Sequence, residues 1–107
     1  MVDYTGFFPT VDNATDWMIN LMNRVIDEST ALRVHSHIEE FDGATSPPGF
    51  AAVVLLDESH LTAHCYSQKG WLSIDCFTCG STDTAAIISA MEAAIKAASP
   101  SVKLEKY

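Results

Sequence analysis

Basic residues are scarce in this sequence. Its 107 residues include six lysines and arginines against 14 aspartates and glutamates, which gives a formal net charge of −8 at pH 7. A field of this sign repels the phosphates of nucleic acids and of anionic lipids. We therefore expect neither nucleic acid nor a membrane surface as a partner, whereas a small cationic ligand is compatible with the charge.

Long hydrophobic runs and abundant cysteine are also missing. No stretch approaches the roughly 20 apolar residues that a membrane-spanning helix needs, and the first ten residues lack the basic start of a secretory signal peptide. Three cysteines cannot all pair with one another, and thiols stay reduced in the cytoplasm. We therefore expect a cytoplasmic protein whose cysteines act as thiols rather than in disulfides.

Length and composition predict a single folded domain over residues 1–107. Hydrophobic residues make up 48% of the chain and charged residues 19%, which is typical of a globular protein. A chain of this length builds one hydrophobic core and not two. The proline- and glycine-rich stretch "DGATSPPGF" at 42–50 indicates a loop between two halves of similar size.

Two segments have the apolar spacing of amphipathic helices. The first begins near Asn13 or Thr15, either of which can cap it. The second has Ser81 and Thr82 as candidate caps and Asp83 in its first turn. The apolar residues that recur at helical spacing are Trp17, Met18, Leu21, Met22 and Val25 in the first helix, and Ile87, Ile88, Met91, Ile95 and Ala98 in the second.

The remaining segments indicate strands, and "AAVVLL" at 51–56 is apolar on both faces, as in the interior of a sheet. The order of elements predicts an α+β fold: a two-layer sandwich of a mainly antiparallel sheet with both helices on one face. The predicted strands are 2–8, 32–41, 50–56, 60–66, 71–77 and 102–104.

The second face of such a sheet needs cover. In "WLSIDCF", Trp71, Ser73, Asp75 and Phe77 alternate with apolar residues and so belong to one face. A homodimer that stacks sheet on sheet would cover that face. We therefore expect a homodimer.

Residues 55–80 concentrate an acid, a serine, two histidines and all three cysteines. A zinc site from His60, His64, Cys76 and Cys79 is disfavoured, because residues three apart in a strand point to opposite faces. A redox Cys-x-x-Cys motif normally opens a helix, and here it does not. Hence we expect no metal and no redox centre. A hydrolase triad is also disfavoured, because no glycine-flanked elbow surrounds Ser59.

Two motifs together resemble the prokaryotic S-adenosylmethionine decarboxylase family. They are "DESHLTAH" at 57–64 and "FTCG" at 77–80, and the order of helices and strands extends the resemblance over nearly the whole chain. The resemblance implies an enzyme that makes its own pyruvoyl cofactor from a serine of the chain. It also implies a lyase that supplies the aminopropyl donor for spermidine biosynthesis.

The resemblance implies that the chain cleaves itself between Glu58 and Ser59, leaving a β chain 1–58 and an α chain 59–107. Ser59 would attack the carbonyl of Glu58, and a pyruvoyl group would finally stand in place of Ser59. This chemistry requires a residue with a β-heteroatom, such as serine. His64 matches the histidine that assists this processing. Since Ser59 and His64 would face opposite sides of a regular strand, we expect the scissile bond to lie in a bend.

The resemblance also assigns roles in the decarboxylation itself. The pyruvoyl group would take up S-adenosylmethionine as a Schiff base and serve as the electron sink for loss of carbon dioxide. Cys79 occupies the position of the proton donor. Phe41 and Phe50, on either side of the 42–50 loop, and Tyr66 are candidate contacts for the adenine ring.

The sequence differs from the family pattern at two positions that bear on function. The second processing hydroxyl of the family falls on Ala51, with Thr45 or Ser46 of the preceding loop as candidate substitutes, and a family glutamate falls on Gln68. Two alternatives therefore stay open. One is a pyruvoyl-dependent decarboxylase of arginine or ornithine, and the other is a non-cleaving homologue that acts as a binding or regulatory subunit.

Overall fold

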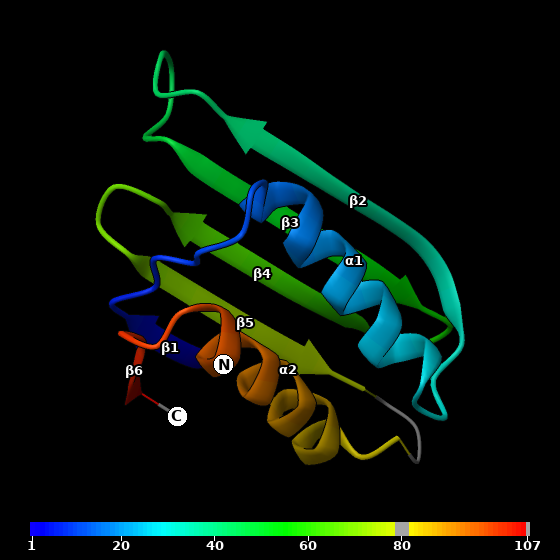
Figure 1. The fold of residues 1–107 in the computed structure, drawn as a ribbon. Coiled ribbons are helices and arrows are strands. Elements are labelled where there is room, and N and C mark those ends of the chain that lie inside the picture. The colour runs from blue at the N-terminus through cyan, green and yellow to red at the C-terminus, as the bar shows by residue number, and fades with distance from the viewer. Residues whose placement is uncertain (79–81, 107) are drawn as a thin grey trace.

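The computed structural model describes residues 1–78 and 82–106 of the chain (Figure 1). Within these residues, neither helix is long and apolar enough to cross a bilayer. The elements in chain order are β1 (Val2–Thr5), α1 (Ala14–Asp27), β2 (Arg33–Phe41), β3 (Gly49–Leu56), β4 (His60–Tyr66), β5 (Trp71–Phe77), α2 (Thr84–Ala98) and β6 (Lys103–Lys106).

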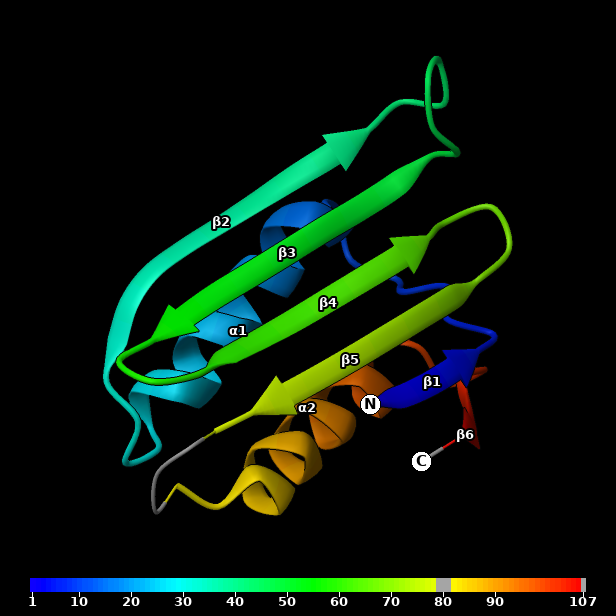
Figure 2. The same cartoon turned by 180° about the vertical axis from the view of Figure 1, so that it is seen from behind.

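The strands form one six-stranded sheet in the order β2-β3-β4-β5-β1-β6, and each described pair is antiparallel. Both helices lie on the same face (Figure 1). The opposite face, here called the open face, carries no element of the described chain (Figure 2). The predicted two-layer α+β sandwich is confirmed, and β3, which contains "AAVVLL", is an interior strand as expected.

Helix α1 starts where the sequence predicts. The Asn13 side chain caps it by accepting a hydrogen bond from the Asp16 backbone N–H at 3.1 Å, which satisfies a donor that the first turn leaves free. Its apolar stripe packs on the sheet. The buried residues of the stripe are Met18, Leu21, Met22, Val25 and Ile26.

The start of α2 differs from the prediction. Asp83 is the N-cap rather than a first-turn residue, since its carboxylate accepts a hydrogen bond from the Ala86 N–H at 3.2 Å. Thr82 therefore precedes the cap, and Ser81 lies outside the described residues. An aspartate accepts this bond as well as a serine or threonine does, so the choice among neighbouring cap residues was open in the sequence.

Strand β1 is shorter than predicted, because the chain turns at Gly6 instead of continuing to Phe8. Gly6 has φ +69°, a left-handed conformation that disfavours other residues. After this turn the Phe7 N–H donates to the Gly70 carbonyl at 2.9 Å. The Phe8 N–H donates to the buried Ser99 hydroxyl at 2.8 Å, which fixes the segment between β1 and α1 against the end of α2.

The core lies between the helices and the covered face of the sheet. Alternate residues of each interior strand point into it, and Leu61, Ala63 and Ile74 are completely buried. Their neighbours along the strands point to the open face. The open face therefore carries the polar and aromatic residues of β4 and β5, as the alternation in 71–77 predicts.

Candidate active site

The Glu58–Ser59 bond lies in the hairpin turn between β3 and β4. The Leu56 N–H donates to the Ser59 carbonyl at 2.9 Å and closes the turn. Asp57 and Glu58 are exposed at its tip, and Ser59 is half-buried just before β4 begins at His60. The bond thus lies in a bend outside the ladder, as expected, where its carbonyl is free of strand pairing.

His64 lies on the open face, exposed, near the other end of β4. Its cross-strand neighbours are Ala51 on β3 and Ser73 on β5. Five residues of extended chain separate it from Ser59, a distance of about 16 Å along the strand. A single chain therefore does not bring Ser59 and His64 together.

The surroundings of His64 form a shallow recess of about 270 Å³ on the open face. Within it, the Ser73 hydroxyl donates a hydrogen bond to the Asp3 carboxylate of β1 at 2.7 Å. The ring of Tyr66 meets that of Trp71 edge to face, with centroids 6.1 Å apart. The recess is lined by Asp3, Tyr4, Thr5, His64, Tyr66, Trp71, Leu72 and Ser73.

His60 is the histidine next to the proposed cleavage bond. Its Nε2 lies 3.4 Å from a carboxylate oxygen of Asp75, and its ring stacks on Phe77 with centroids 5.9 Å apart. Sequence reasoning considered His60 only as a zinc ligand and missed this pair. The alternation of β4 and β5 offered a signal, because it places His60, Asp75 and Phe77 on the same face.

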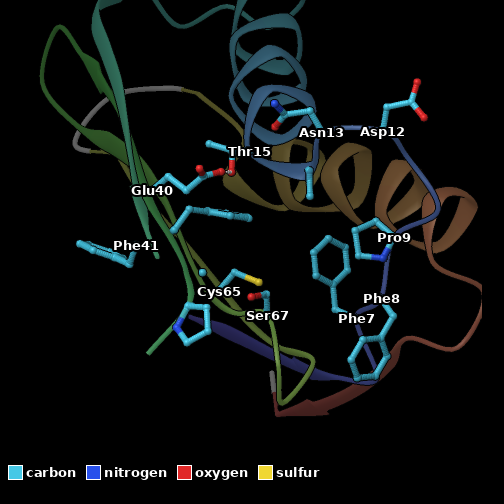
Figure 3. A pocket seen from close by; sticks show the side chains of 14 residues that line it. Phe7, Phe8, Pro9, Asp12, Asn13, Thr15, Glu40, Phe41, Cys65 and Ser67 are labelled. Atoms are coloured by element: carbon cyan, nitrogen blue, oxygen red, sulfur yellow. Dashed lines mark hydrogen bonds between the residues drawn. The ribbon is translucent and has the colours of Figure 1, made fainter. Parts of the chain in front are cut away.

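The three candidate adenine contacts divide between the two faces of the sheet. Phe41 and Tyr66 flank Gly49 in one cross-strand row on the open face. Phe50, in contrast, is only 4% exposed and packs in the core. Figure 3 shows the Phe41 ring on the far side of the strands from Phe7. Adjacent register positions of β3 point to opposite faces, so Phe41 and Phe50 cannot hold one ring between them.

A larger cavity of about 500 Å³ lies under the N-terminus of α1 (Figure 3). The Thr15 hydroxyl donates to the Glu40 carboxylate at 2.5 Å across one side of it. The cavity lies at the Gly49 end of β3, about 25 Å along eight residues from the end that leads to Ser59. Its lining residues are Phe7, Phe8, Pro9, Asp12, Asn13, Ala14, Thr15, Glu40, Phe41, Pro48, Gly49, Phe50, Cys65 and Ser67.

Two of the cysteines point away from the open face. Burial raises the pKa of Cys65 to about 11, and burial together with the charge of Asp75 raises that of Cys76 to about 11. Cys76 is the cross-strand neighbour of the fully buried Leu61 and lies on the helix-covered side of the sheet. His60 and His64 lie on the other face. The zinc set considered from the sequence is thus split between two faces, and Cys79 lies outside the described residues.

These raised pKa values predict that Cys65 and Cys76 resist alkylation in the folded protein. At pH 8.5 both thiols are protonated, and the reactive thiolate is about 100-fold rarer than for an ordinary cysteine. Reactivity should appear only as the pH approaches 11. Peptide mapping after brief iodoacetamide treatment measures this, with the urea-unfolded chain as control. Modification of either residue at equal rates in the folded and unfolded chain would contradict the assigned burial.

The fold and the site define an α+β sandwich whose open sheet face carries a histidine recess, with a serine in a turn at the end of the sheet. Residues 1–105 match the family model described as S-adenosylmethionine decarboxylase. The chain belongs to this family.

Several bacterial relatives carry the name S-adenosylmethionine decarboxylase proenzyme. One from Sulfurihydrogenibium sp. is 30% identical over 93 residues, 87% of this chain and 65% of the relative. A protein from Symbiobacterium thermophilum is 45% identical over 51 residues, 47% of this chain and 39% of the relative. A "proenzyme 2" from Bacillus cereus is 45% identical over 56 residues, 52% of this chain and 42% of the relative. The matched part is thus less than two thirds of each relative's length.

Proposed function

We propose that the chain is a self-processing, pyruvoyl-dependent decarboxylase of S-adenosylmethionine. The observation that carries the proposal is the position of the Glu58–Ser59 bond, in a turn and outside the ladder, in a member of this family. The names of the relatives, which describe proenzymes, support the same conclusion. The product would be the aminopropyl donor for spermidine.

The turn suits the chemistry of self-cleavage. The Ser59 hydroxyl attacks the Glu58 carbonyl, and the amide becomes an ester with a free amine on residue 59. Elimination then releases the Glu58 carboxylate, and hydrolysis expels the nitrogen as ammonia, which leaves the pyruvoyl group. The first step tilts the peptide out of its plane, and a turn tolerates this distortion better than a paired strand does.

The pyruvoyl group would supply an electrophilic ketone that draws electrons from the substrate as carbon dioxide leaves. The chain itself must bind the adenine, exclude water and return a proton. Phe41 and Tyr66 share the open face and are the better placed of the three aromatic candidates, whereas Phe50 supports the core beneath them. Cys79 remains the proposed proton donor on the strength of its motif.

The same geometry supports a homodimer. His64 and the aromatic row lie about 16 Å or more from Ser59 along β4, so one chain holds the parts of the site at opposite ends of its open face. A two-fold axis between two stacked sheets, running across the strands, places the His64 end of each chain over Ser59 of its partner. Each dimer would then contain two sites, and both open faces would be covered.

Carbon dioxide release tests the substrate assignment. The cleaved protein should turn over S-adenosylmethionine faster than arginine or ornithine, each supplied alone at equal concentration. The open face offers the rings of Phe41 and Tyr66 for an adenine. Of the carboxylates near the loop, Glu40 is bonded to Thr15 on the covered side, whereas Glu39 shares the open face, where it lies beside His37. Faster release from arginine or ornithine would overturn the substrate while leaving self-processing intact.

A further inference from the structure

Ser73 is a cross-strand neighbour of His64 on the open face. His64 has two cross-strand neighbours there, Ala51 and Ser73. Side chains at such positions have Cβ atoms about 4.5–5.5 Å apart, within reach of a hydrogen bond. Ala51 offers no polar side-chain group, so of these two neighbours Ser73 is the one that can hydrogen-bond to the imidazole.

Asp3 fixes the direction of the Ser73 hydroxyl hydrogen. The single hydroxyl hydrogen of Ser73 is donated to the Asp3 carboxylate at 2.7 Å, and both residues are half-buried. Toward His64 the serine oxygen therefore presents only lone pairs. An imidazole that bonds to it must donate its N–H, which leaves the other ring nitrogen unprotonated.

We propose that Ser73 and Asp3 are positioning residues for self-cleavage, holding His64 in the tautomer whose free nitrogen acts as the base. The inference rests on the proposed function. In the proposed dimer, the free nitrogen takes the hydroxyl proton of the Ser59 that lies over it, which belongs to the other protomer, as that serine oxygen bonds to the carbonyl carbon of the Glu58 before it. The same proton then passes to the amide nitrogen as the carbon–nitrogen bond breaks. While His64 carries the proton, Asp3 stabilises the imidazolium through the serine.

The cleavage rate tests the role of the hydroxyl. Ser73→Ala should slow cleavage about 10- to 100-fold, the range for loss of a hydrogen bond to a charged group. Ser73→Thr, which keeps the hydroxyl, should cleave within about threefold of wild type.

The tautomer of His64 is a second readout that does not depend on cleavage. In the uncleavable Ser59→Ala chain, nitrogen-15 NMR should show one ring nitrogen of His64 predominantly protonated at high pH. Adding Ser73→Ala should shift the two nitrogens toward the tautomer mixture of free histidine.

The outcomes separate the inference from the proposed function. A Ser73→Ala chain that cleaves at the wild-type rate with an unchanged His64 tautomer overturns the inference. Slow cleavage in both Ser73→Ala and Ser73→Thr, with no change of the His64 tautomer, also overturns it, since that pattern indicates a merely structural role. If the wild-type chain does not cleave, the proposed function fails, and the NMR comparison still decides whether Ser73 orients His64.

Discussion

Two variants that cannot cleave themselves alone should restore cleavage when they form a mixed dimer. His64→Ala keeps the serine but lacks the base, and Ser59→Ala keeps the base but lacks the serine. Because Ser59 and His64 lie about 16 Å apart along one chain, the proposed dimer takes the histidine of each site from the partner. Co-expression of the two variants should yield cleaved His64→Ala chains and intact Ser59→Ala chains. Mass spectrometry distinguishes the two by a size tag on one of them.

Each variant expressed alone is the control and should stay intact. A double variant that carries both changes, co-expressed with Ser59→Ala, should also stay intact, because no serine is then available. If His64→Ala chains stay uncleaved in the mixture although mixed dimers are present, the shared site is wrong. Full cleavage of His64→Ala alone would instead remove His64 from processing.

Cys79→Ala should cleave normally and then lose most of its decarboxylase activity. In the proposed mechanism, cleavage depends on Ser59 and His64, whereas protonation of the substrate carbon needs the thiol of Cys79. Loss of a positioned proton donor costs about 10²–10⁴-fold in kcat. The ratio of kcat for the two cleaved proteins, measured by carbon dioxide release, gives the effect directly.

Cys76→Ala is the matched control for this variant. It removes a thiol three residues away whose side chain points to the helix-covered side and whose pKa is raised to about 11. Its decarboxylation rate should stay within a few-fold of wild type. Equal losses in the two variants would indicate damage to the fold rather than loss of a proton donor.

The alternation of apolar residues carried most of the information on the fold. In 71–77 it predicts the two faces of β5 correctly, and Leu72 and Ile74 are buried as expected. Element ends were less predictable, because they depend on single contacts. The turn at Gly6 ends β1 early, and the carboxylate of Asp83 caps α2 in place of its neighbours.

The candidate site was harder to predict, because its geometry depends on strand register. The spacing of Ser59 and His64 correctly predicted that the Glu58–Ser59 bond lies in a bend. It gave no indication that Phe50 lies in the core while Phe41 lies on the open face. Which side chains share a face is set by pairing across strands, and a one-residue shift would exchange the faces.

Contacts between separate strands were missed for the same reason. The Ser73–Asp3 hydrogen bond joins residues 70 positions apart. The His60–Asp75 pair joins positions on two strands whose register is fixed by the turn between them. A single sequence contains the residues of these pairs but no measure of their proximity.

The intact mass of the purified chain tests the central claim most directly. The account predicts two fragments under denaturing conditions, residues 1–58 and residues 59–107, the second with a pyruvoyl group in place of its first serine and therefore resistant to Edman sequencing. Ser59→Ala should give the single full-length mass. A wild-type chain that remains one unmodified species after prolonged incubation, with its native fold intact, would contradict self-processing and identify the chain as a non-cleaving member of its family.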